Sequence, residues 1–537
     1  MRACQSAVCV TALAVIGGMM LSCCGAAEPL KEPRTNWPVY HVTALPDEGV
    51  ALPYDANGCI FWKGRYHPMY IFQDPKLPNG GHCWGHLSST DLVNWTYHPA
   101  TLIPAPGDAD TGIFSGNAFV NKDGVPMLCW FGIDAGVCVA TAEDDGLIRW
   151  KKHPKNPIIP VPKKGEPGDG VYKVWDPYLW LEGDTYYCLL GGNTLPNGKD
   201  TLYLCKSPDM VTWQPLHPFY EHPDLTWTTE TNDPDTPEFF RREDCSCPDF
   251  FKLGDKHVLL CISHKIGGRC YVGRYENEKF YPEQHVRMNW PGAQFFAPES
   301  LLDEKGRRVF WAWVTDPRTR PAQDRTGSGF QSLPRIMSLA DDGTMRIVPA
   351  PELEALRQNP RRVENIALND GADAAPAGIS GTHLELSAEI DPRDAKEVGL
   401  KLFCSPDGKE ETAVWYDPAK KVLRVDVSRS TQRDDLCYGE LVFTGYNSKK
   451  GSDNKKPVFV AEAPLALNAG EPLKLRAFLD GPMLEVFAND RQCVTQVVYP
   501  KSAEASGIKF CARGGNATVR SVEAWDMAAA KFEDKRR

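Results

Sequence analysis

The stretch STDLVNW at residues 89–95 decides the fold, because it returns as SPDMVTW at residues 207–213. A weaker copy ends at Trp150, so the closing tryptophans stand at intervals of roughly 60 residues. Pairs of short apolar runs around a polar turn accompany these repeats and predict β-hairpins over 59–72, 178–190, 249–262 and 300–314. Hairpins repeated at this period are typical of a β-propeller, whose blades bury their faces against each other. The segment from about 50 to 350 would hold five such units, which predicts five blades.

The pattern changes after the last of these units. Residues 351–381 are charged and locally helical at first and then rich in Ala, Gly and Asp, which indicates a linker. Strict alternation of polar and apolar residues follows, as in LELSAEI (384–390) and LKLRAFL (473–479), and predicts a β-sandwich. We therefore expect an all-β chain, with a five-bladed β-propeller over 36–350, a linker over 351–381, a C-terminal β-sandwich over 382–526 and a charged, loose tail over 527–537.

Charge and composition exclude two classes of protein. The 537 residues include 60 Lys and Arg against 70 Asp and Glu, a formal net charge of −10 at pH 7. Because phosphate contacts need clustered positive charge, a basic nucleic-acid binder is excluded. With 42% hydrophobic and 10% aromatic residues, the chain is not intrinsically disordered.

The N-terminal segment predicts export. Residues 1–26 combine an early arginine, an apolar run from about Ala7 to Leu21 and then small residues, as in a bacterial signal peptide. The segment MLSC at 20–23 also resembles a lipobox, in which Cys23 would be lipidated, and cleavage after Ala26 or Ala27 is the alternative. We expect a periplasmic or extracellular protein, or one tethered to the cell surface by a lipid anchor.

The cysteines are expected to be mainly structural. Four of the 18 lie in the signal segment, and the others fit small buried side chains on strands, with a few disulfides permitted in an exported chain. Cys245 and Cys247 form a C-x-C pair, but no second pair stands at zinc-site spacing. No metal site is predicted.

Carboxylates occupy the places where blades would begin: Asp55, Asp176, and Glu243 with Asp244. The inner strands of a propeller surround a common axis, so these side chains can converge from distant positions. A retaining glycosidase needs two carboxyl groups about 5 to 5.5 Å apart, one as nucleophile and one as proton donor. An ordinary turn at Asp55 and a plain ion pair of Glu243 with its neighbouring arginines are the alternatives.

Five motifs stand in order along the chain: WGHLSSTDLVNW (84–95), FSGNA (114–118), RVFWAWV (308–314), SLPR (332–335), and LEVFAND (484–490) followed by VYP (498–500). Together they resemble the signatures of glycoside hydrolase family 32, the invertases, levanases and inulinases. The resemblance runs from about residue 50 to 526. It implies chemistry on sugars that requires no metal and no organic cofactor.

The resemblance assigns roles to single residues. Asp55 matches the nucleophile of the family's N-D-P-N-G, and Asp176 matches the Asp of R-D-P, which stabilises the oxocarbenium-like transition state. Gln73 looks like the family's substrate-binding glutamine. The other residues expected to contact the sugar are Asn57, Trp84, Phe114, Ser115, Trp175 and Glu299.

The departures from the family pattern concern the sugar and the acid/base. The chain has YDANG (54–58) for N-D-P-N-G and Trp175 for the arginine of R-D-P, which leaves room for a glycosyl unit other than a terminal fructosyl unit. Where the family reads E-C-P-D, this chain reads SCPD (246–249). Strand alternation puts Asp244 on the face of Ser246, whereas Glu243 needs a one-residue bulge to point inward. Glu243 has the reach of the family's acid and is preferred, with Asp244 as the alternative.

The leading hypothesis is an exported retaining glycoside hydrolase that cleaves β-fructofuranosidic bonds of the levan, inulin or sucrose type, or related glycan bonds. Asp55 would attack the anomeric carbon, Glu243 or Asp244 would protonate the leaving oxygen and then activate water, and Asp176 would stabilise the charge. One alternative is a carbohydrate-binding propeller protein without catalysis. Another is an arabinan or xylan hydrolase on the same propeller. A carbohydrate is the expected partner, and the oligomeric state is left open.

Overall fold

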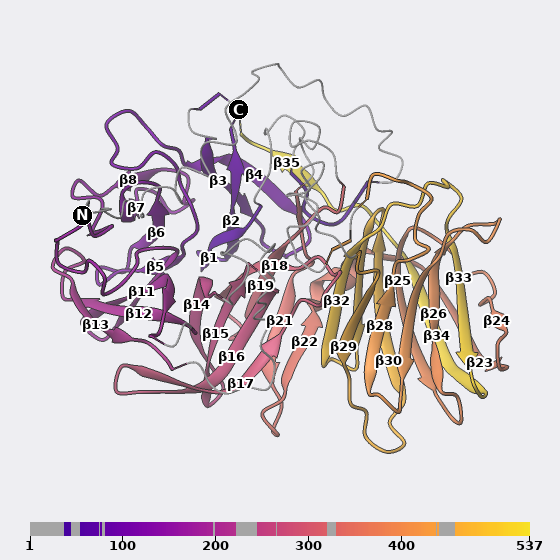
Figure 1. Cartoon of the computed structure of the whole chain (residues 1–537). Coiled ribbons are helices and arrows are strands. Elements are labelled where there is room, and N and C mark those ends of the chain that lie inside the picture. The colour runs from indigo at the N-terminus through magenta and orange to yellow at the C-terminus, as the bar shows by residue number, and fades with distance from the viewer. Residues whose placement is uncertain are drawn as a thin grey trace, which may run out of the picture.

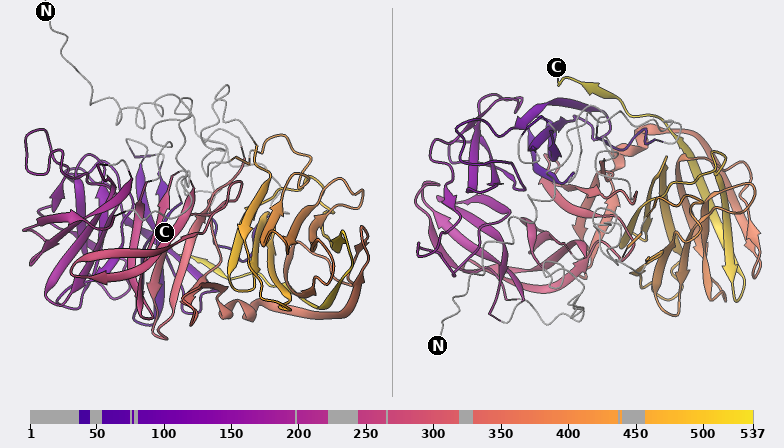
Figure 2. Two further views of the ribbon diagram at one scale, coloured as in Figure 1. Left: turned by 60° about the horizontal axis from the view of Figure 1, so that its bottom comes forward. Right: turned by 45° about the horizontal axis from the view of Figure 1, so that its top comes forward.

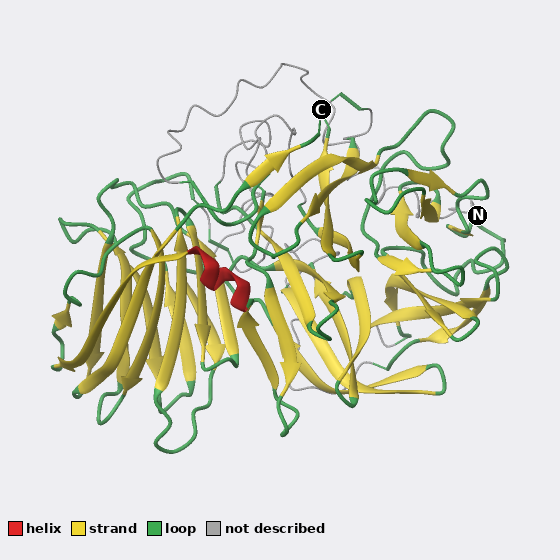
Figure 3. Cartoon of the chain, turned by 180° about the vertical axis from the view of Figure 1, so that it is seen from behind, coloured by secondary structure: helices red, strands yellow, loops and turns green. Residues whose placement is uncertain are grey.

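The structure is a computed structural model. It describes residues 37–44, 54–74, 76–77, 81–196, 199–221, 244–264, 266–318, 329–436, 438–439 and 457–536. Their regular structure is almost entirely β-strand, with one short 3-10 helix, η3 (Pro351–Leu356), drawn in red in Figure 3. Within these ranges no helix has the length and apolar character needed to cross a membrane. The expectation of an all-β chain is confirmed.

The described residues between 56 and 349 form five antiparallel sheets, which we call the five-sheet region, and each sheet is built from consecutive strands (Figure 1). The first holds β1 (Ala56–Trp62), β2 (Arg65–Gln73), β3 (His82–Ser88) and β4 (Trp95–Leu102). The second holds β5 (Ala118–Val120), β6 (Pro126–Gly132), β7 (Gly136–Ala142) and β8 (Trp150–Lys152), with β9 (Ile159–Pro160) beside β7. The third holds β10 (Pro177–Glu182), β11 (Thr185–Thr194), β12 (Asp200–Ser207) and β13 (Gln214–Pro218).

The last two sheets of this region follow the same order. The fourth holds β14 (Ser246–Leu253), β15 (Lys256–Ser263), β16 (Gly267–Glu276) and β17 (Lys279–Arg287). The fifth holds β18 (Phe296–Leu302), β19 (Arg308–Val314), β21 (Arg335–Leu339) and β22 (Met345–Pro349), with β20 (Phe330–Gln331) beside β19. The four predicted hairpins are confirmed, because each matches the first two strands of a sheet.

The repeated S-x-D-x-x-x-W segment is the turn between the third and fourth strands. In the first sheet Asp91 Oδ1 accepts hydrogen bonds from the backbone N–H groups of Val93 (3.0 Å) and Asn94 (2.7 Å). In the third sheet Asp209 Oδ1 accepts the equivalent bonds at 2.9 and 2.7 Å. The carboxylate thus satisfies backbone donors that the turn leaves unpaired, which explains why an aspartate recurs there.

The first strands of the five sheets contact one another in sequence. β1 contacts β5, β5 contacts β10, β10 contacts β14, β14 contacts β18, and β18 contacts β1. Side chains that precede these strands are therefore held near one another although they are far apart in the chain. This arrangement positions the candidate site.

The C-terminal part, which we call the two-sheet region, consists of two six-stranded sheets that share one hydrophobic core. One sheet holds, in spatial order, β23 (Arg357–Leu368), β34 (Ala517–Met527), β25 (His383–Asp391), β30 (Leu473–Asp480), β31 (Met483–Ala488) and β32 (Gln492–Val497). The other holds β24 (Asp373–Ala374), β33 (Gly507–Arg513), β26 (Glu397–Cys404), β27 (Thr412–Asp417), β28 (Val422–Asp426) and β29 (Val460–Pro464). Figure 2 shows this region, orange to yellow, beside the five-sheet region.

Two expectations about the ends of this region are wrong. The segment 351–381 is not only a linker, because it contains η3 and the twelve-residue strand β23, which pairs with β34. The tail is not loose over its strand β35 (Phe532–Asp534), which pairs with β4 of the first sheet in parallel. Both segments gain backbone hydrogen bonds from strands that are distant in sequence, and local charge could not predict such pairing.

A buried ion network joins the two regions; it consists of His41, Arg335, Asp480 and Glu485. Arg335 Nη2 lies 2.9 Å from Glu485 Oε2, and His41 Nδ1 lies 2.8 Å from Asp480 Oδ2. All four side chains are almost fully buried. Burial lowers the pKa of His41, but the hydrogen bonds to Asp480 and Glu485 outweigh this and raise the pKa to about 9. The SLPR and LEVFAND motifs therefore meet at the contact between the regions.

The thirteen cysteines in the described ranges are all free, and all but Cys247 are buried. The expectation of small buried side chains is confirmed for these residues, whereas disulfides among them are not formed. Burial raises the pKa of most of these thiols, as at Cys129 and Cys205, where it reaches about 12. These thiols are therefore unreactive packing groups.

A cluster of buried neutral histidines predicts sensitivity to acid. His67 Nδ1 lies 2.9 Å from His86 Nε2, and burial lowers the pKa of His67 to about 3. The unfolded chain binds this proton below about pH 6.5 while the folded state does not, so stability is lost as pH falls through that value. Between pH 6.5 and 5 we expect His67 to cost about 2 kcal/mol of the free energy of unfolding. Urea unfolding at both pH values checks this.

The matched variants are His67→Gln and His217→Gln, the second on outer strand β13. His67→Gln is expected to flatten the dependence of unfolding free energy on pH, and His217→Gln to leave it as in the wild type. Equal slopes in all three proteins would contradict the explanation.

Candidate active site

Asp55 and Asp176 converge on one residue of the fourth sheet, Cys247. Asp55 precedes β1 and Asp176 precedes β10, and both carboxyl groups are buried. The backbone N–H of Cys247 donates to Asp176 Oδ2 at 3.1 Å. Cys247 Sγ lies 3.6 Å from Asp176 Oδ2, 4.0 Å from Asp55 Oδ2 and 3.4 Å from Ser115 Oγ. The structure therefore brings together the predicted nucleophile, the predicted transition-state stabiliser and Ser115.

β-Bulges shape the backbone at this point. The register shifts between Asn57 and Ile60 in β1 and between Ser246 and Asp249 in β14. Each bulge contains a residue with positive φ, Gly58 at 55° and Cys247 at 45°. A bulge turns the chain and re-aims neighbouring side chains, as bulges often do next to active sites. Asp244 lies two residues before Ser246, where the bulge of β14 begins, and Asp55 lies two residues before Asn57, where the bulge of β1 begins.

The two convergent carboxyl groups are hard to ionise. Burial, reinforced by the charge of Asp176, raises the pKa of Asp55 to about 7, although His264 and Ser115 act in the opposite direction. Burial likewise raises the pKa of Asp176 to about 6, opposed by His264 and by the N–H of Cys247. Asp55 Oδ1 is buried and has no hydrogen-bond partner in the described part of the chain.

The alternative acid/base, Asp244, is tightly held. Its Oδ2 accepts a hydrogen bond from Ser246 Oγ at 2.9 Å, as expected for side chains on one face. His264 supplies two more contacts, backbone N–H to Oδ1 and ring Nδ1 to Oδ2, both at 2.8 Å. The buried guanidinium of Arg269 donates to the Asp244 carbonyl at 2.5 Å and to Asp200 at 2.9 Å. The preferred acid/base, Glu243, lies outside the described residues.

His264 was not predicted from the sequence. It directly follows β15, and β15 pairs with β14 so that Ile262 faces Ser246. Continuing this antiparallel register by two residues at the open end of the hairpin brings His264 opposite Asp244. Extension of the predicted hairpin over 249–262 would have located His264 only with the bulge between Ser246 and Asp249 included.

Three predicted sugar contacts form hydrogen bonds with the backbone around the site. Asn57 is 1% exposed, and its side chain bonds to the Asp55 carbonyl at 3.0 Å and to the Gly116 N–H at 2.9 Å. Trp84 is 0% exposed and donates from Nε1 to the Phe114 carbonyl at 3.0 Å. Glu299 accepts from the Cys59 N–H at 3.1 Å, and burial raises its pKa well above the ordinary value. These side chains support the site from within the protein.

An aromatic wall borders the site. Phe114 stacks on His82 with ring centroids 4.6 Å apart, and His82 Nε2 lies 3.1 Å from Gln73 Nε2. Trp175 packs beside Phe114 and Phe131 at 6.0 and 4.7 Å. Phe114 and Trp175 are only partly buried. Aromatic faces of this kind are suited to the apolar faces of sugar rings.

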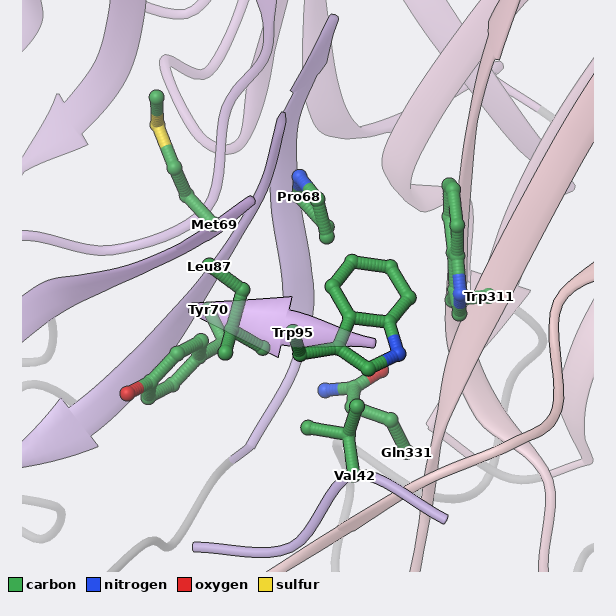
Figure 4. A pocket seen from close by; sticks show the side chains of 8 residues that line it. All are labelled: Val42, Pro68, Met69, Tyr70, Leu87, Trp95, Trp311 and Gln331. Carbon is green, nitrogen blue, oxygen red and sulfur yellow. The ribbon is translucent and has the colours of Figure 1, made fainter. Parts of the chain in front are cut away.

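A small internal void is lined by other side chains (Figure 4). Its lining is mainly apolar and comes from the first and fifth sheets and the segment before them: Val42, Pro68, Met69, Tyr70, Leu87, Trp95, Trp311 and Gln331. None of the predicted site residues lines it. We regard it as a packing void and not as the sugar-binding site.

Two sequence models of one enzyme family match this chain. A sequence model described as "Glycosyl hydrolases family 32 N-terminal domain" matches residues 50–351, and one described as "Glycosyl hydrolases family 32 C terminal" matches residues 352–526. The chain belongs to glycoside hydrolase family 32. The chain is thus an O-glycosyl hydrolase by family, and the resemblance drawn from the five motifs is confirmed.

The relatives named here share little sequence identity with this family 32 chain, but they align with it over most of both chains. It is 26% identical to a fructan 1-exohydrolase of Triticum urartu, over 96% of this chain and 92% of the relative. It is 26% identical to a sucrose-6-phosphate hydrolase of Zymomonas mobilis, over 92% and 93%. The crystal structure of fructan 1-exohydrolase IIa from Cichorium intybus superposes with a TM-score of 0.76 at 23% identity, covering 94% of this chain and 99% of that one. That similarity shows a shared fold.

Proposed function

We propose that this family 32 hydrolase cleaves β-fructofuranosidic bonds of fructans or sucrose-type sugars by a double-displacement mechanism. The observation that carries the proposal is the convergence of Asp55 and Asp176 on Cys247. The relatives named as fructan 1-exohydrolase and sucrose-6-phosphate hydrolase support the substrate class. A related structure was determined in complex with 1-kestose, which also favours a fructose-containing ligand.

We further infer that the chain consists of a five-bladed β-propeller followed by a β-sandwich. The contacts between first strands run from β1 through β5, β10 and β14 to β18 and return to β1, which supports a closed five-bladed β-propeller. The two six-stranded sheets around one core support a C-terminal β-sandwich. The catalytic groups then lie at one end of the propeller axis, where the first strands begin.

Asp55 and Asp176 have different roles in the first displacement of the proposed reaction. An ionised Asp55 attacks the anomeric carbon through Oδ1, and the leaving oxygen receives a proton as the glycosidic bond breaks. Asp176, next to Asp55, carries negative charge against the oxocarbenium-like transition state. Because ionised Asp55 is required, kcat/KM should fall as pH drops through its pKa of about 7.

Trp175 is expected to contribute to sugar binding. Trp175→Ala removes one of the two partly buried rings of the aromatic wall, so KM for a fructan oligosaccharide should rise roughly 3- to 10-fold while kcat changes little. Steady-state kinetics check this. Trp213→Ala, at the outer turn between β12 and β13, is the control and should leave KM unchanged. If both variants behave alike, the aromatic wall does not touch substrate.

A glycan panel tests the proposed function. Inulin, levan, 1-kestose and sucrose are offered to the wild-type protein beside arabinan and xylan, and released sugars are measured. Release of fructose from at least one β-fructofuranoside is the expected result. Binding without turnover on every glycan would replace the proposal with a carbohydrate-binding protein. Turnover of arabinan or xylan alone would assign the site to the other hydrolase class.

We also propose that the protein is exported. The basis is the apolar run and the small residues within 1–26. The mass of the mature protein from a bacterial host should correspond to a start at a lipidated Cys23 or just after Ala26 or Ala27. A mature chain that retains Met1 would contradict export.

A further inference from the structure

We propose that Cys247 is a positioning residue of this active site, whose backbone N–H and thiol S–H hold the carboxyl groups of Asp55 and Asp176 in the arrangement that the reaction uses. The inference rests on the proposed function, because it concerns the two carboxyl groups that act in that reaction. Cys247 acts on Asp176 directly and on Asp55 by way of the Ser115 hydroxyl.

The backbone of Cys247 is held in a conformation that directs its N–H to Asp176. Cys247 has a φ of 45°, in the left-handed region that residues other than glycine rarely adopt. This conformation belongs to the bulge of β14, and in it the N–H donates to Asp176 Oδ2 at 3.1 Å. Strained backbone of this kind is concentrated at active sites, where a fixed geometry is needed. The bulge thus supplies a donor to a carboxyl group that precedes the third sheet.

The bulge does not by itself require a cysteine. The equivalent bulges hold Gly58 in β1, at a φ of 55°, and Ala297 in β18, at a φ of 45°. A hydrogen atom or a methyl group is therefore enough for this backbone conformation. Cys247 differs from both because its side chain carries a donor, and it is the one cysteine in the described ranges that is not buried. The shape of the strand therefore does not explain the thiol.

The thiol of Cys247 lies among the oxygen atoms of the site. Its Sγ is 3.4 Å from Ser115 Oγ, 3.6 Å from Asp176 Oδ2 and 4.0 Å from Asp55 Oδ2. Ser115 Oγ in turn donates to Asp55 Oδ2 at 3.4 Å. A thiol has one proton, so it donates either to Asp176 or to Ser115, whose own hydroxyl proton then points to Asp55. In both arrangements the thiol proton supports a carboxylate.

The thiol stays protonated and therefore remains a donor. Burial raises the pKa of Cys247 well above its ordinary value, and the charges of Asp176 and Asp55 act in the same direction. The two carboxylates also repel each other, because the charge of Asp176 adds to burial in raising the pKa of Asp55. A hydrogen bond to an ionised group favours that form. Donors placed between the two carboxyl groups thus lower the free energy of the state in which both are ionised.

Other charged groups act on the same two carboxyl groups. Burial has the largest effect and raises the pKa of both Asp55 and Asp176. His264, after β15, lowers both pKa values, and Asp244, before β14, raises the pKa of Asp176. The N–H and the thiol of Cys247 each lower the pKa of Asp176. Loss of the thiol alone should therefore change the pH dependence in a known direction while these other charges stay in place.

Two substitutions distinguish a donor from a group that only fills space. Cys247→Ala keeps the backbone N–H and removes the thiol, whereas Cys247→Ser keeps a donor. In Cys247→Ala the acid limb of kcat/KM on 1-kestose should move to higher pH by roughly 0.5 to 1 unit, because ionising both carboxyl groups costs more. A smaller folded fraction would lower the rate at every pH and would not move the limb. Cys247→Ser should stay within roughly threefold of the wild type.

Cys245→Ala is the matched control, because its thiol is buried in the core between the third and fourth sheets, two residues before Cys247. This control should leave the pH profile unchanged. Cys247→Ser less active than Cys247→Ala, with the acid limb unmoved in both, would show that the thiol only fills space and would overturn the proposal.

The infrared S–H stretch of Cys247 tests the contact without turnover. The difference between the spectra of the wild type and Cys247→Ala isolates this band. It should move to lower frequency between about pH 5 and pH 8, as the carboxyl groups ionise and accept the S–H more strongly, and Asp176→Asn should reduce the shift. A band that does not move with pH overturns the proposal. A band that moves in a wild type that cleaves no fructoside overturns the proposed function instead.

Discussion

Asp55→Asn is expected to abolish turnover and, at the same time, to stabilise the protein. The amide cannot form the covalent intermediate, so kcat should fall by about 10⁴-fold or more. The folded state holds the proton of Asp55 up to a pKa of about 7, whereas an unfolded aspartate releases it near 4. Stability therefore falls as pH rises through this window, and ionised Asp55 should cost about 2 to 4 kcal/mol above it. Asn removes that cost.

The measurement combines fructoside hydrolysis with urea unfolding at pH 8. Glu299→Gln is the matched control, because burial raises the pKa of Glu299 well above its ordinary value and so favours the protonated carboxyl, which an amide resembles, and because its Oε1 accepts a hydrogen bond from the Cys59 N–H. This control should retain both activity and stability. Retained turnover in Asp55→Asn would remove Asp55 from the nucleophile position. A loss of turnover accompanied by a loss of stability would show that the residue is needed for folding.

Arg335→Met is expected to produce the largest loss of stability. The change leaves Glu485 buried without the guanidinium that lies 2.9 Å away, and it also removes the bond from Arg335 to Thr495 Oγ1 at 2.6 Å. Removing one partner of a buried ion pair costs about 3 to 5 kcal/mol, and we expect the lower end because His41 still lies 3.5 Å from Glu485. Methionine preserves most of the apolar packing of the arginine stem. Because the pair joins the five-sheet region to the two-sheet region, both should unfold at lower urea concentration.

Two further variants make the test specific. Arg520→Met removes a half-exposed arginine that pairs with Glu389 and Asp391 at 3.1 Å, and it should cost no more than about 0.5 kcal/mol. The double variant Arg335→Met with Glu485→Met should cost less than the sum of its single changes, since it leaves no unpaired partner of either charge. Equal costs for Arg335→Met and Arg520→Met would contradict the importance of the buried network.

Local patterns in the sequence predicted the first two strands of four sheets in the five-sheet region. Apolar runs around polar turns located the hairpins, because a strand's pattern depends on its own residues and the nearest turn. The positions of Asp55 and Asp176 before first strands also predicted their convergence. Pairing between distant segments was not predictable in this way. The tail strand β35 adds to β4, and β23 adds to β34, through backbone groups that carry no local signature.

The exposure of single side chains at the site could not be predicted from the sequence. Asn57, Trp84 and Glu299, which are predicted as sugar contacts, are buried about as deeply as Asp55, Asp176 and Ser115, so their contact with a sugar stays a prediction. Phe114 and Trp175 remain partly exposed and keep the predicted role. His264 was missed because its importance comes from Asp244 across the hairpin and from two carboxylates on other sheets.

The stereochemistry of the reaction tests the central claim most directly. A covalent intermediate on Asp55 requires two inversions, so hydrolysis of 1-kestose or sucrose in buffer containing methanol should yield methyl β-fructofuranoside, a product that does not change its anomeric form afterwards. NMR spectra of the wild-type reaction should show this product, and the Asp55→Asn reaction should show none. Methyl α-fructofuranoside would contradict double displacement through Asp55.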